Sequence, residues 1–162
     1  MTINEVRFAS RELAESLAGT PDMAIISITD PGTPKAHLAP QFQHVLRLAF
    51  YDAVPADEYL PAPFPGMFDY LIARRISKFV STLHQAPDAL SMMVHCEYGI
   101  SRSAAVALFV EAYTGAPLVA REFTYDANQW VIDQLSKLHP ELQIDIPPQI
   151  QARDRRRAAR AA

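Results

Sequence analysis

The stretch SMMVHCEYGISRSAAVALFV, residues 91–110, decides how we interpret this chain of 162 residues. Residues 91–94 are mostly apolar and predict the end of a buried strand. Residues 104–110 are apolar throughout and predict a buried helix. Between them lies a short segment that contains Gly99 and the chain's only cysteine, Cys96. The sequence therefore predicts a tight loop between a strand and a helix N-terminus, with a nucleophile at its start.

A loop of this kind favours the binding of an oxyanion. Its successive backbone N–H groups form a concave nest, and the helix dipole adds positive potential. The same surroundings stabilise a thiolate, so we expect Cys96 to be reactive. Arg102 follows after five intervening residues and offers a planar fork for two phosphate oxygens. Ser103 falls in the first turn of the predicted helix, where its hydroxyl can donate to the sulfur of Cys96. Gly99, in the middle of the loop, permits a close approach of the backbone to another segment.

The sequence His-Cys, five further residues and Arg-Ser, residues 95–103, resembles the signature of protein tyrosine phosphatases. Its ending, Gly-Ile-Ser-Arg-Ser, is most similar to the dual-specificity branch, and a looser likeness extends over residues 22–138. The resemblance implies that Cys96 is the nucleophile, that Arg102 clamps the phosphate and that Ser103 assists the thiolate. It also implies that His95 supports the cysteine from behind the loop. Rhodanese-type loops have a different spacing, and arsenate reductases need additional cysteines that this chain lacks.

The resemblance implies that the phosphate is bound by backbone N–H groups of the loop. The residues expected to supply them are Glu97, Tyr98, Gly99, Ile100, Ser101 and Arg102. Because an inward carboxylate would repel phosphate, we expect the side chain of Glu97 to point away from the pocket. The loop carries this glutamate and no lysine, which favours a phosphorylated protein or a simple aryl phosphate as substrate.

A cysteine phosphatase also needs a group that protonates the leaving oxygen and later deprotonates the attacking water. The resemblance implies an aspartate on a loop after an upstream strand, and the predicted strand 45–50 is followed by Tyr51 and Asp52. We therefore predict Asp52, which lies 44 positions before Cys96, a longer spacing than in compact members of the branch. The proline-rich loop 53–66 accounts for the extra length.

Three other acidic residues compete with this prediction. Asp57 and Glu58 lie in the proline-rich loop, and Asp57 is the stronger alternative because it could swing in from the loop tip. Asp69 is better explained as a residue of a helix first turn, where the dipole favours a carboxylate. Farther along, Asn128 matches a position that orients the hydrolytic water in the family, and helix capping explains it equally well.

Strand and helix patterns alternate along the chain. We expect strands over 5–9, 23–28, 45–50 and 92–95, and helices over 10–18, 67–84, 104–110 and 125–138. This alternation predicts an α/β fold with a central, mostly parallel sheet flanked by helices. In such folds ligands bind at the carboxyl ends of the strands, where Cys96 is expected. We predict one phosphatase domain over 1–150 and an exposed tail rich in Arg and Ala over 151–162.

Composition narrows the possible partners. The chain is 49% hydrophobic with 20% charged residues, as expected of a globular domain, and its net charge of −3 argues against nucleic-acid binding. With neither a signal peptide nor an apolar run of membrane-spanning length, we expect a cytoplasmic monomer that does not bind membranes. The other histidines have no metal-ligand spacing and are expected in loops or on the surface: His37, His44, His84 and His139.

These observations predict a metal-independent cysteine phosphatase that needs no cofactor and works through a phosphocysteine intermediate. The expected substrate is phosphotyrosine on proteins, with phosphoserine and phosphothreonine as further candidates. Two alternatives stay open: a non-catalytic phosphate-recognition module, and a phosphatase for phosphoinositides or RNA 5′-phosphates.

Overall fold

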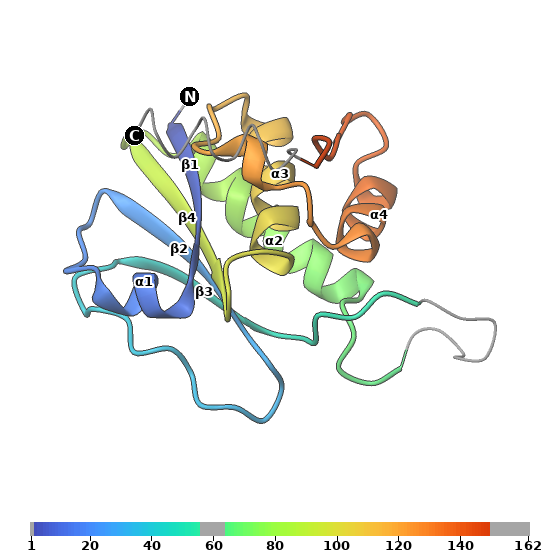
Figure 1. The fold of residues 1–162 in the computed structure, drawn as a ribbon. Coiled ribbons are helices and arrows are strands. Elements are labelled where there is room, and N and C mark those ends of the chain that lie inside the picture. The colour runs from blue at the N-terminus through green and yellow to red at the C-terminus, as the bar shows by residue number, and fades with distance from the viewer. Residues whose placement is uncertain (1, 56–63, 150–162) are drawn as a thin grey trace.

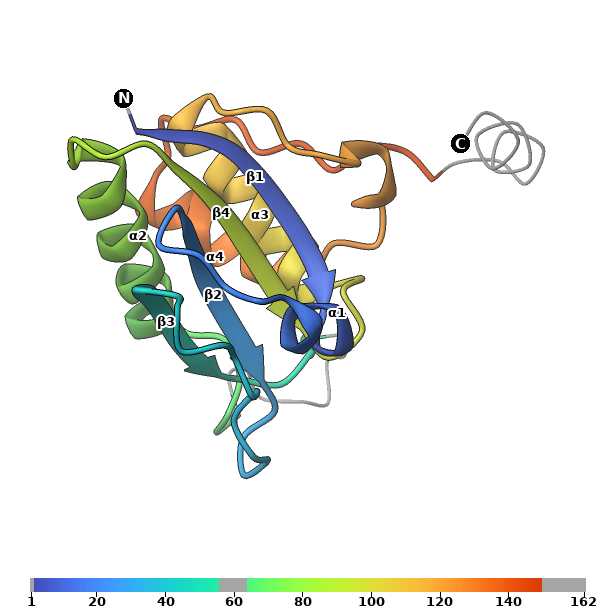
Figure 2. The same ribbon diagram turned by 90° about the vertical axis from the view of Figure 1, so that its left-hand side faces the viewer.

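The computed structural model describes residues 2–55 and 64–149, in which four parallel strands form one sheet of order β1-β4-β2-β3. The strands are β1 (Ile3–Ser10), β2 (Met23–Thr29), β3 (His44–Ala49) and β4 (Leu90–Cys96). The central strand β4 pairs with β1 and β2, and β3 pairs with the far side of β2. The carboxyl ends of all four strands therefore lie at the same end of the sheet, and Cys96 is the last residue of β4 (Figure 2).

Helices cover both faces of this sheet. They are α1 (Arg11–Ser16), α2 (Tyr70–Gln85), α3 (Arg102–Thr114) and α4 (Gln129–Leu138), with a 3-10 turn η1 (Arg121–Phe123). The helices α2, α3 and α4 pack on one face and enclose the main core, while α1 lies on the other face (Figures 1 and 2). A second, smaller cluster on the α1 side includes Ile25, Phe42 and Met93. The predicted α/β architecture is thus confirmed.

The apolar pattern of α3 explains its central position. Residues 102–110 of this helix are all buried, because the helix packs between the sheet and the neighbouring helix α4 (Figure 1). The helix ends at Thr114 and is capped by Gly115, whose φ of 73° lies in the left-handed region. The strand–loop–helix unit around Cys96 is therefore the core of the domain as well as the location of the predicted site.

Three helices begin at polar caps that the sequence indicates. The side chains of Ser10, Asp69 and Asn128 each accept a hydrogen bond from the backbone N–H three residues further on. The capping role expected for Asn128 is confirmed, Ser10 caps α1 in the same way, and Asp69 stands at the start of α2 as expected.

Several predicted boundaries need correction. The last helix begins at Gln129 rather than at residue 125, because Asn128 is its cap and residues 121–123 form a separate 3-10 turn. The first helix ends at Ser16, two residues before the predicted end. Leu71, an apolar residue of the predicted helix 67–84, is 65% exposed. Its neighbours Ile72 and Ala73 pack on the core, so Leu71 lies on the solvent side of the same turn.

His84 contradicts the expectation of a surface or loop histidine. It is buried near the end of α2, where its Nδ1 accepts a hydrogen bond from the N–H of Ile3 at 3.3 Å. Its ring also contacts Tyr113 edge-on, with 6.5 Å between the ring centroids. Burial lowers the pKa of His84, because the charged form loses its hydration.

The outer strands of the sheet are engaged by other segments. On the β1 side, the N–H of Val6 donates to Pro117 at 3.0 Å, and the N–H of Val119 donates to Val6 at 2.9 Å. On the β3 side, the guanidinium of Arg75 in α2 donates to the carbonyl of Arg47 at 3.2 Å. Backbone groups of Val6 in β1 and of Arg47 in β3 are thus occupied by neighbouring segments.

No helix in the described parts of the chain has the length and apolarity that crossing a bilayer requires. The Arg- and Ala-rich tail that the sequence predicts over 151–162 lies outside the described residues, as do Asp57 and Glu58.

Candidate active site

The loop between Cys96 and α3 packs directly against the end of β1. Gly99, at its middle, has a φ of 70°, in the left-handed region. A Cβ at this position would lie 2.5 Å from the carbonyl carbon of Ala9 and 2.5 Å from the nitrogen of Ser10. Because both are backbone atoms, they cannot move aside as a side chain would. The sequence predicts this close approach, and the geometry explains why the position needs glycine.

The thiol of Cys96 lies against the first turn of α3. Its side chain is buried, and Sγ lies 3.1 Å from Oγ of the fully buried Ser103. As a thiol, Cys96 donates to this hydroxyl; as a thiolate, it would accept from it. The serine therefore stands where the sequence places it, within reach of the sulfur.

His95 lies behind the loop and is fully buried. Its Nε2 is 2.6 Å from Oγ of Ser27 in the neighbouring strand β2, and its Nδ1 is 3.5 Å from the carbonyl oxygen of Cys96. Burial lowers the pKa of His95 because the interior penalises the charged imidazolium. The residue thus supports the strand end as a neutral ring and does not line the loop.

Arg102 is a nearly buried cation at the start of α3, with a side chain only 5% exposed. Its Nη1 donates to the carbonyl of Phe50 at 2.7 Å and to Oδ1 of Asp30 at 2.6 Å. Its Nε is buried and has no hydrogen-bond partner among the described residues. The protein therefore binds Nη1 of the guanidinium, while the buried Nε is a donor without an acceptor among the described residues.

The backbone donors of the loop are similarly unused. Within residues 2–55 and 64–149, the N–H groups of residues 97–102 donate no hydrogen bond to another part of the protein. These are the groups that the sequence predicts for phosphate binding, in a segment that runs into a helix N-terminus. A run of unpartnered N–H groups before a helix N-terminus favours an anionic ligand.

Asp52 lies directly beside this loop. Its Oδ1 accepts from Oγ of Ser101 at 2.8 Å and from Nδ2 of Asn128 at 2.8 Å. Its Oδ2 forms no hydrogen bond to the described residues. Of the acidic alternatives, Asp69 caps α2, while Asp57 and Glu58 lie outside the described residues. The structure brings Asp52 to the loop, and its role as the proton donor stays a prediction.

Asn128 has more contacts than either of its predicted roles requires. Its Oδ1 caps α4 by accepting from the N–H of Val131, while its Nδ2 donates to Asp52 and, at 3.2 Å, to the carbonyl of Ala53. Its own N–H donates to the carbonyl of Ser101 at 3.1 Å. The residue therefore ties α4 to both the loop and Asp52. A role in orienting water stays a prediction.

The remaining side chains of the loop lie at its outer side. Oε2 of Glu97 is 3.7 Å from the guanidinium of Arg11 in α1, and its carbonyl accepts from the N–H of Arg11 at 3.2 Å. Tyr98 and Ile100 are 78% and 52% exposed. The carboxylate of Glu97 is thus paired with a cation of the neighbouring helix.

Asp30 is the site residue that sequence reasoning missed. It follows β2 and makes the shorter of the two contacts with Arg102. A signal was available, because Asp30 directly follows a predicted strand. In a parallel sheet the carboxyl end of a strand next to β4 lies at the same end of the sheet as Cys96. In the sequence alone, Asp30 stands out only as part of the turn that ends the strand.

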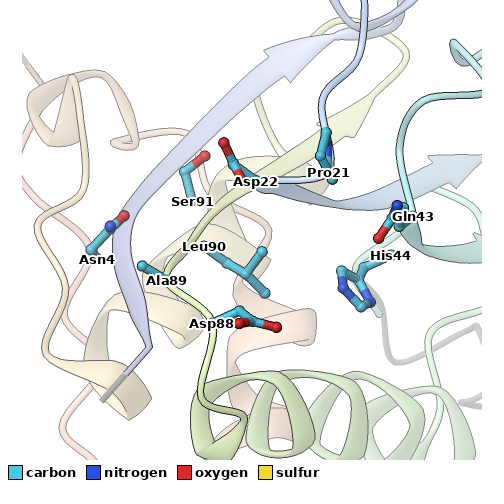
Figure 3. A pocket seen from close by; sticks show the side chains of 9 residues that line it. All are labelled: Asn4, Pro21, Asp22, Gln43, His44, Asp88, Ala89, Leu90 and Ser91. Carbon is cyan, nitrogen blue, oxygen red and sulfur yellow. The ribbon is translucent and has the colours of Figure 1, made fainter.

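A separate polar pocket lies at the other end of the sheet (Figure 3). It is lined by residues that include Asp22, His44 and Asp88, and by Leu90 and Ser91 at the start of β4. A seven-residue strand spans about 20 Å, so this pocket is remote from Cys96 at the end of β4. It contains neither the cysteine nor the arginine.

A comparison with models of known protein families gives no match to this chain. A search of curated proteins likewise gives no significant match.

We expect Gly99→Ala to lower the free energy of unfolding by roughly 2 kcal/mol or more, because it adds a backbone clash to left-handed strain. Gly32→Ala is a matched control, since Gly32 has a φ of 80° but no heavy atom within 4 Å of the point that a Cβ would occupy. That variant should lose only about 1 kcal/mol. Urea unfolding of both proteins measures the difference, and equal losses would contradict a tight contact with β1.

The buried His95 should make folding pH-dependent. Its pKa is lowered in the folded state, so stability is complete above the unfolded value of about 6.5 and falls as the pH drops below it. We expect His95→Asn to be less stable at neutral pH but to have a flatter stability profile. The slopes should differ by up to about 1.4 kcal/mol per pH unit between about pH 6 and pH 5. Urea unfolding across this range tests the prediction, and parallel profiles would refute it.

Proposed function

We propose that this protein is a metal-independent cysteine phosphatase of the protein tyrosine phosphatase type, closest to the dual-specificity branch. The observation that carries the proposal is the unpartnered, buried Nε of Arg102 in a loop that begins at Cys96. A buried donor on a cation needs an acceptor, and a phosphate oxygen supplies one with the complementary charge. The unused N–H groups of residues 97–102 add further donors to the same loop.

In the proposed first step, the thiolate of Cys96 attacks phosphorus, an S–P bond forms and the bond to the leaving oxygen breaks. Ser103 supports this step, since its hydroxyl lies 3.1 Å from the sulfur and can donate to the thiolate. The position of Cys96 at a strand end, before a helix N-terminus, further stabilises negative charge on the sulfur. Water then cleaves the phosphocysteine and regenerates the thiolate.

Charge on the transferring phosphoryl group would be stabilised by Arg102 and the loop N–H groups. These donors are held in place before a ligand arrives, so little reorganisation is needed as the transition state forms. The planar guanidinium can bind two oxygens through its Nε edge, because Nη1 is already bound to the protein.

Asp52 is the proposed proton donor to the leaving oxygen. Both of its hydrogen-bond donors bind Oδ1, so a protonated carboxyl group would carry its proton on Oδ2. That oxygen is left for the substrate and, in the second step, for the attacking water. The hydrogen bonds from Ser101 and Asn128 hold the carboxyl group beside the loop.

We further propose phosphotyrosine on proteins as the substrate. The loop carries two exposed apolar side chains, Tyr98 and Ile100, whose surface is available to an aromatic ring or a peptide chain. No lysine is present in the loop to bind additional phosphates, as a phosphoinositide would require.

Hydrolysis of aryl phosphates in the presence of EDTA tests the proposed chemistry. Wild type should hydrolyse p-nitrophenyl phosphate, and Cys96→Ser should be inactive because the nucleophile is lost. Asp52→Asn should lose about 100-fold or more with phenyl phosphate, which has a basic leaving group, and less with p-nitrophenyl phosphate. Asp88→Asn, an exposed acidic residue near the start of β4, serves as the control. An active Cys96→Ser variant would overturn the proposal, and wild type with no turnover would favour a recognition module.

Asn128→Ser separates the capping role of Asn128 from its contact with Asp52. Serine caps helices about as well as asparagine, so the cap of α4 should be kept. Losing the Nδ2 hydrogen bonds to Asp52 and Ala53 should lower the free energy of unfolding by about 1 to 2 kcal/mol. The variant lacks the Nδ2 donor that holds Asp52. We expect kcat to fall about tenfold with phenyl phosphate and less with p-nitrophenyl phosphate. An equal loss with both substrates would argue against a link to proton donation.

A further inference from the structure

The end of β2 places a carboxylate against the arginine of the loop. Oδ1 of Asp30 lies 2.6 Å from Nη1 of Arg102, and the carbonyl of Phe50 lies 2.7 Å from the same nitrogen. The strand ends are themselves linked, because the N–H of Phe50 donates to Thr29 at 3.1 Å. The two acceptors therefore come from adjacent strands whose relative position is set by the sheet.

Both contacts act on one nitrogen of a rigid, planar group. Fixing Nη1 by two acceptors fixes the plane of the guanidinium and therefore the direction of its Nε edge. That Nε is buried and has no partner in the described parts of the chain. The ring of Phe50 also lies near the group, with Cζ of Arg102 6.0 Å from its centroid.

The two acceptors differ in charge. The Phe50 carbonyl is neutral, whereas Asp30 supplies the negative charge that a nearly buried guanidinium requires. The carboxylate is itself 43% exposed, so it retains part of its hydration. This ion pair can therefore hold the guanidinium of Arg102 in one orientation before any ligand binds.

We propose that Asp30 is a positioning residue, which orients Arg102 so that its Nε edge faces the bound phosphate. This inference rests on the proposed phosphatase function. In this role Asp30 acts through its contact with the Arg102 cation and transfers no proton, whereas Asp52 accepts, among the described residues, only from the neutral donors Ser101 and Asn128.

Two measurements on Asp30→Ala and Asp30→Asn test the role. The first is kcat/KM for aryl phosphates with leaving groups of increasing basicity. We expect Asp30→Ala to lose about 10- to 100-fold, equally across the series, because Arg102 acts on phosphate whatever the leaving group. Asp30→Asn keeps an oxygen acceptor for Nη1 and should lose less. Asp88→Ala, which removes an acidic residue near the start of β4, is the matched control.

The second measurement is the binding of tungstate, a tetrahedral oxyanion, to Cys96→Ser protein by calorimetry. Adding Asp30→Ala to that protein should weaken tungstate binding about tenfold or more. Circular dichroism confirms that each variant is folded. If Asp30→Ala does not fold, Asp30→Asn is compared with the control, and it should still lose several-fold in both measurements.

Three results would contradict or separate the two proposals. A loss of activity that grows with leaving-group basicity would make Asp30 a proton donor and overturn the inference. Unchanged activity and unchanged tungstate binding in the variants would also overturn it. If wild type hydrolyses no aryl phosphate, while tungstate binding still depends on Asp30, the proposed hydrolase is wrong and the positioning of Arg102 stands.

Discussion

The nearly buried guanidinium of Arg102 constrains which groups can lie at the carboxyl ends of the strands. A charge without partners inside a protein costs several kcal/mol, so Arg102 must be met by acceptors wherever the fold places it. They come from the ends of two strands, Asp30 after β2 and Phe50 after β3. This is possible because the strands are parallel and β2 lies between β4 and β3. The contacts that hold Arg102 in the site consequently depend on the strand order.

The loop that carries this arginine is held from three directions. Gly99 packs against the backbone of β1, Arg102 is bound by the ends of β2 and β3, and the N–H of Asn128 donates to Ser101 from the start of α4. Each contact involves backbone atoms or a buried side chain, so none depends on a flexible surface group. A loop fixed in this way can present its donors without first being ordered by a ligand.

The sequence predicts those parts of the fold whose signals are local. The strand before Cys96 and the helix after it are apolar over continuous stretches, and the caps Ser10 and Asn128 are short polar signals at helix starts. The resemblance to a phosphatase signature selects Asp52, and the structure brings that residue to the loop. These predictions needed no knowledge of strand order.

The contacts that the sequence could not predict depend on which strands are neighbours. Asp30 and Arg102 are 72 positions apart, and they meet only because β2 pairs with β4. The contact of Asn128 with Asp52 likewise requires α4 to pack beside the end of β3. The burial of His84 has no local signal, because its sequence neighbours do not indicate that β1 and Tyr113 cover it.

The segments along the two outer strands have a consequence for the behaviour of this protein in concentrated solution. An open strand edge is a template on which a strand of another molecule can add. Residues 117–119 occupy hydrogen-bonding groups of β1, and the side chain of Arg75 occupies a carbonyl of β3. These contacts leave fewer free backbone groups on β1 and β3, and so reduce the number of places at which another sheet could pair with them.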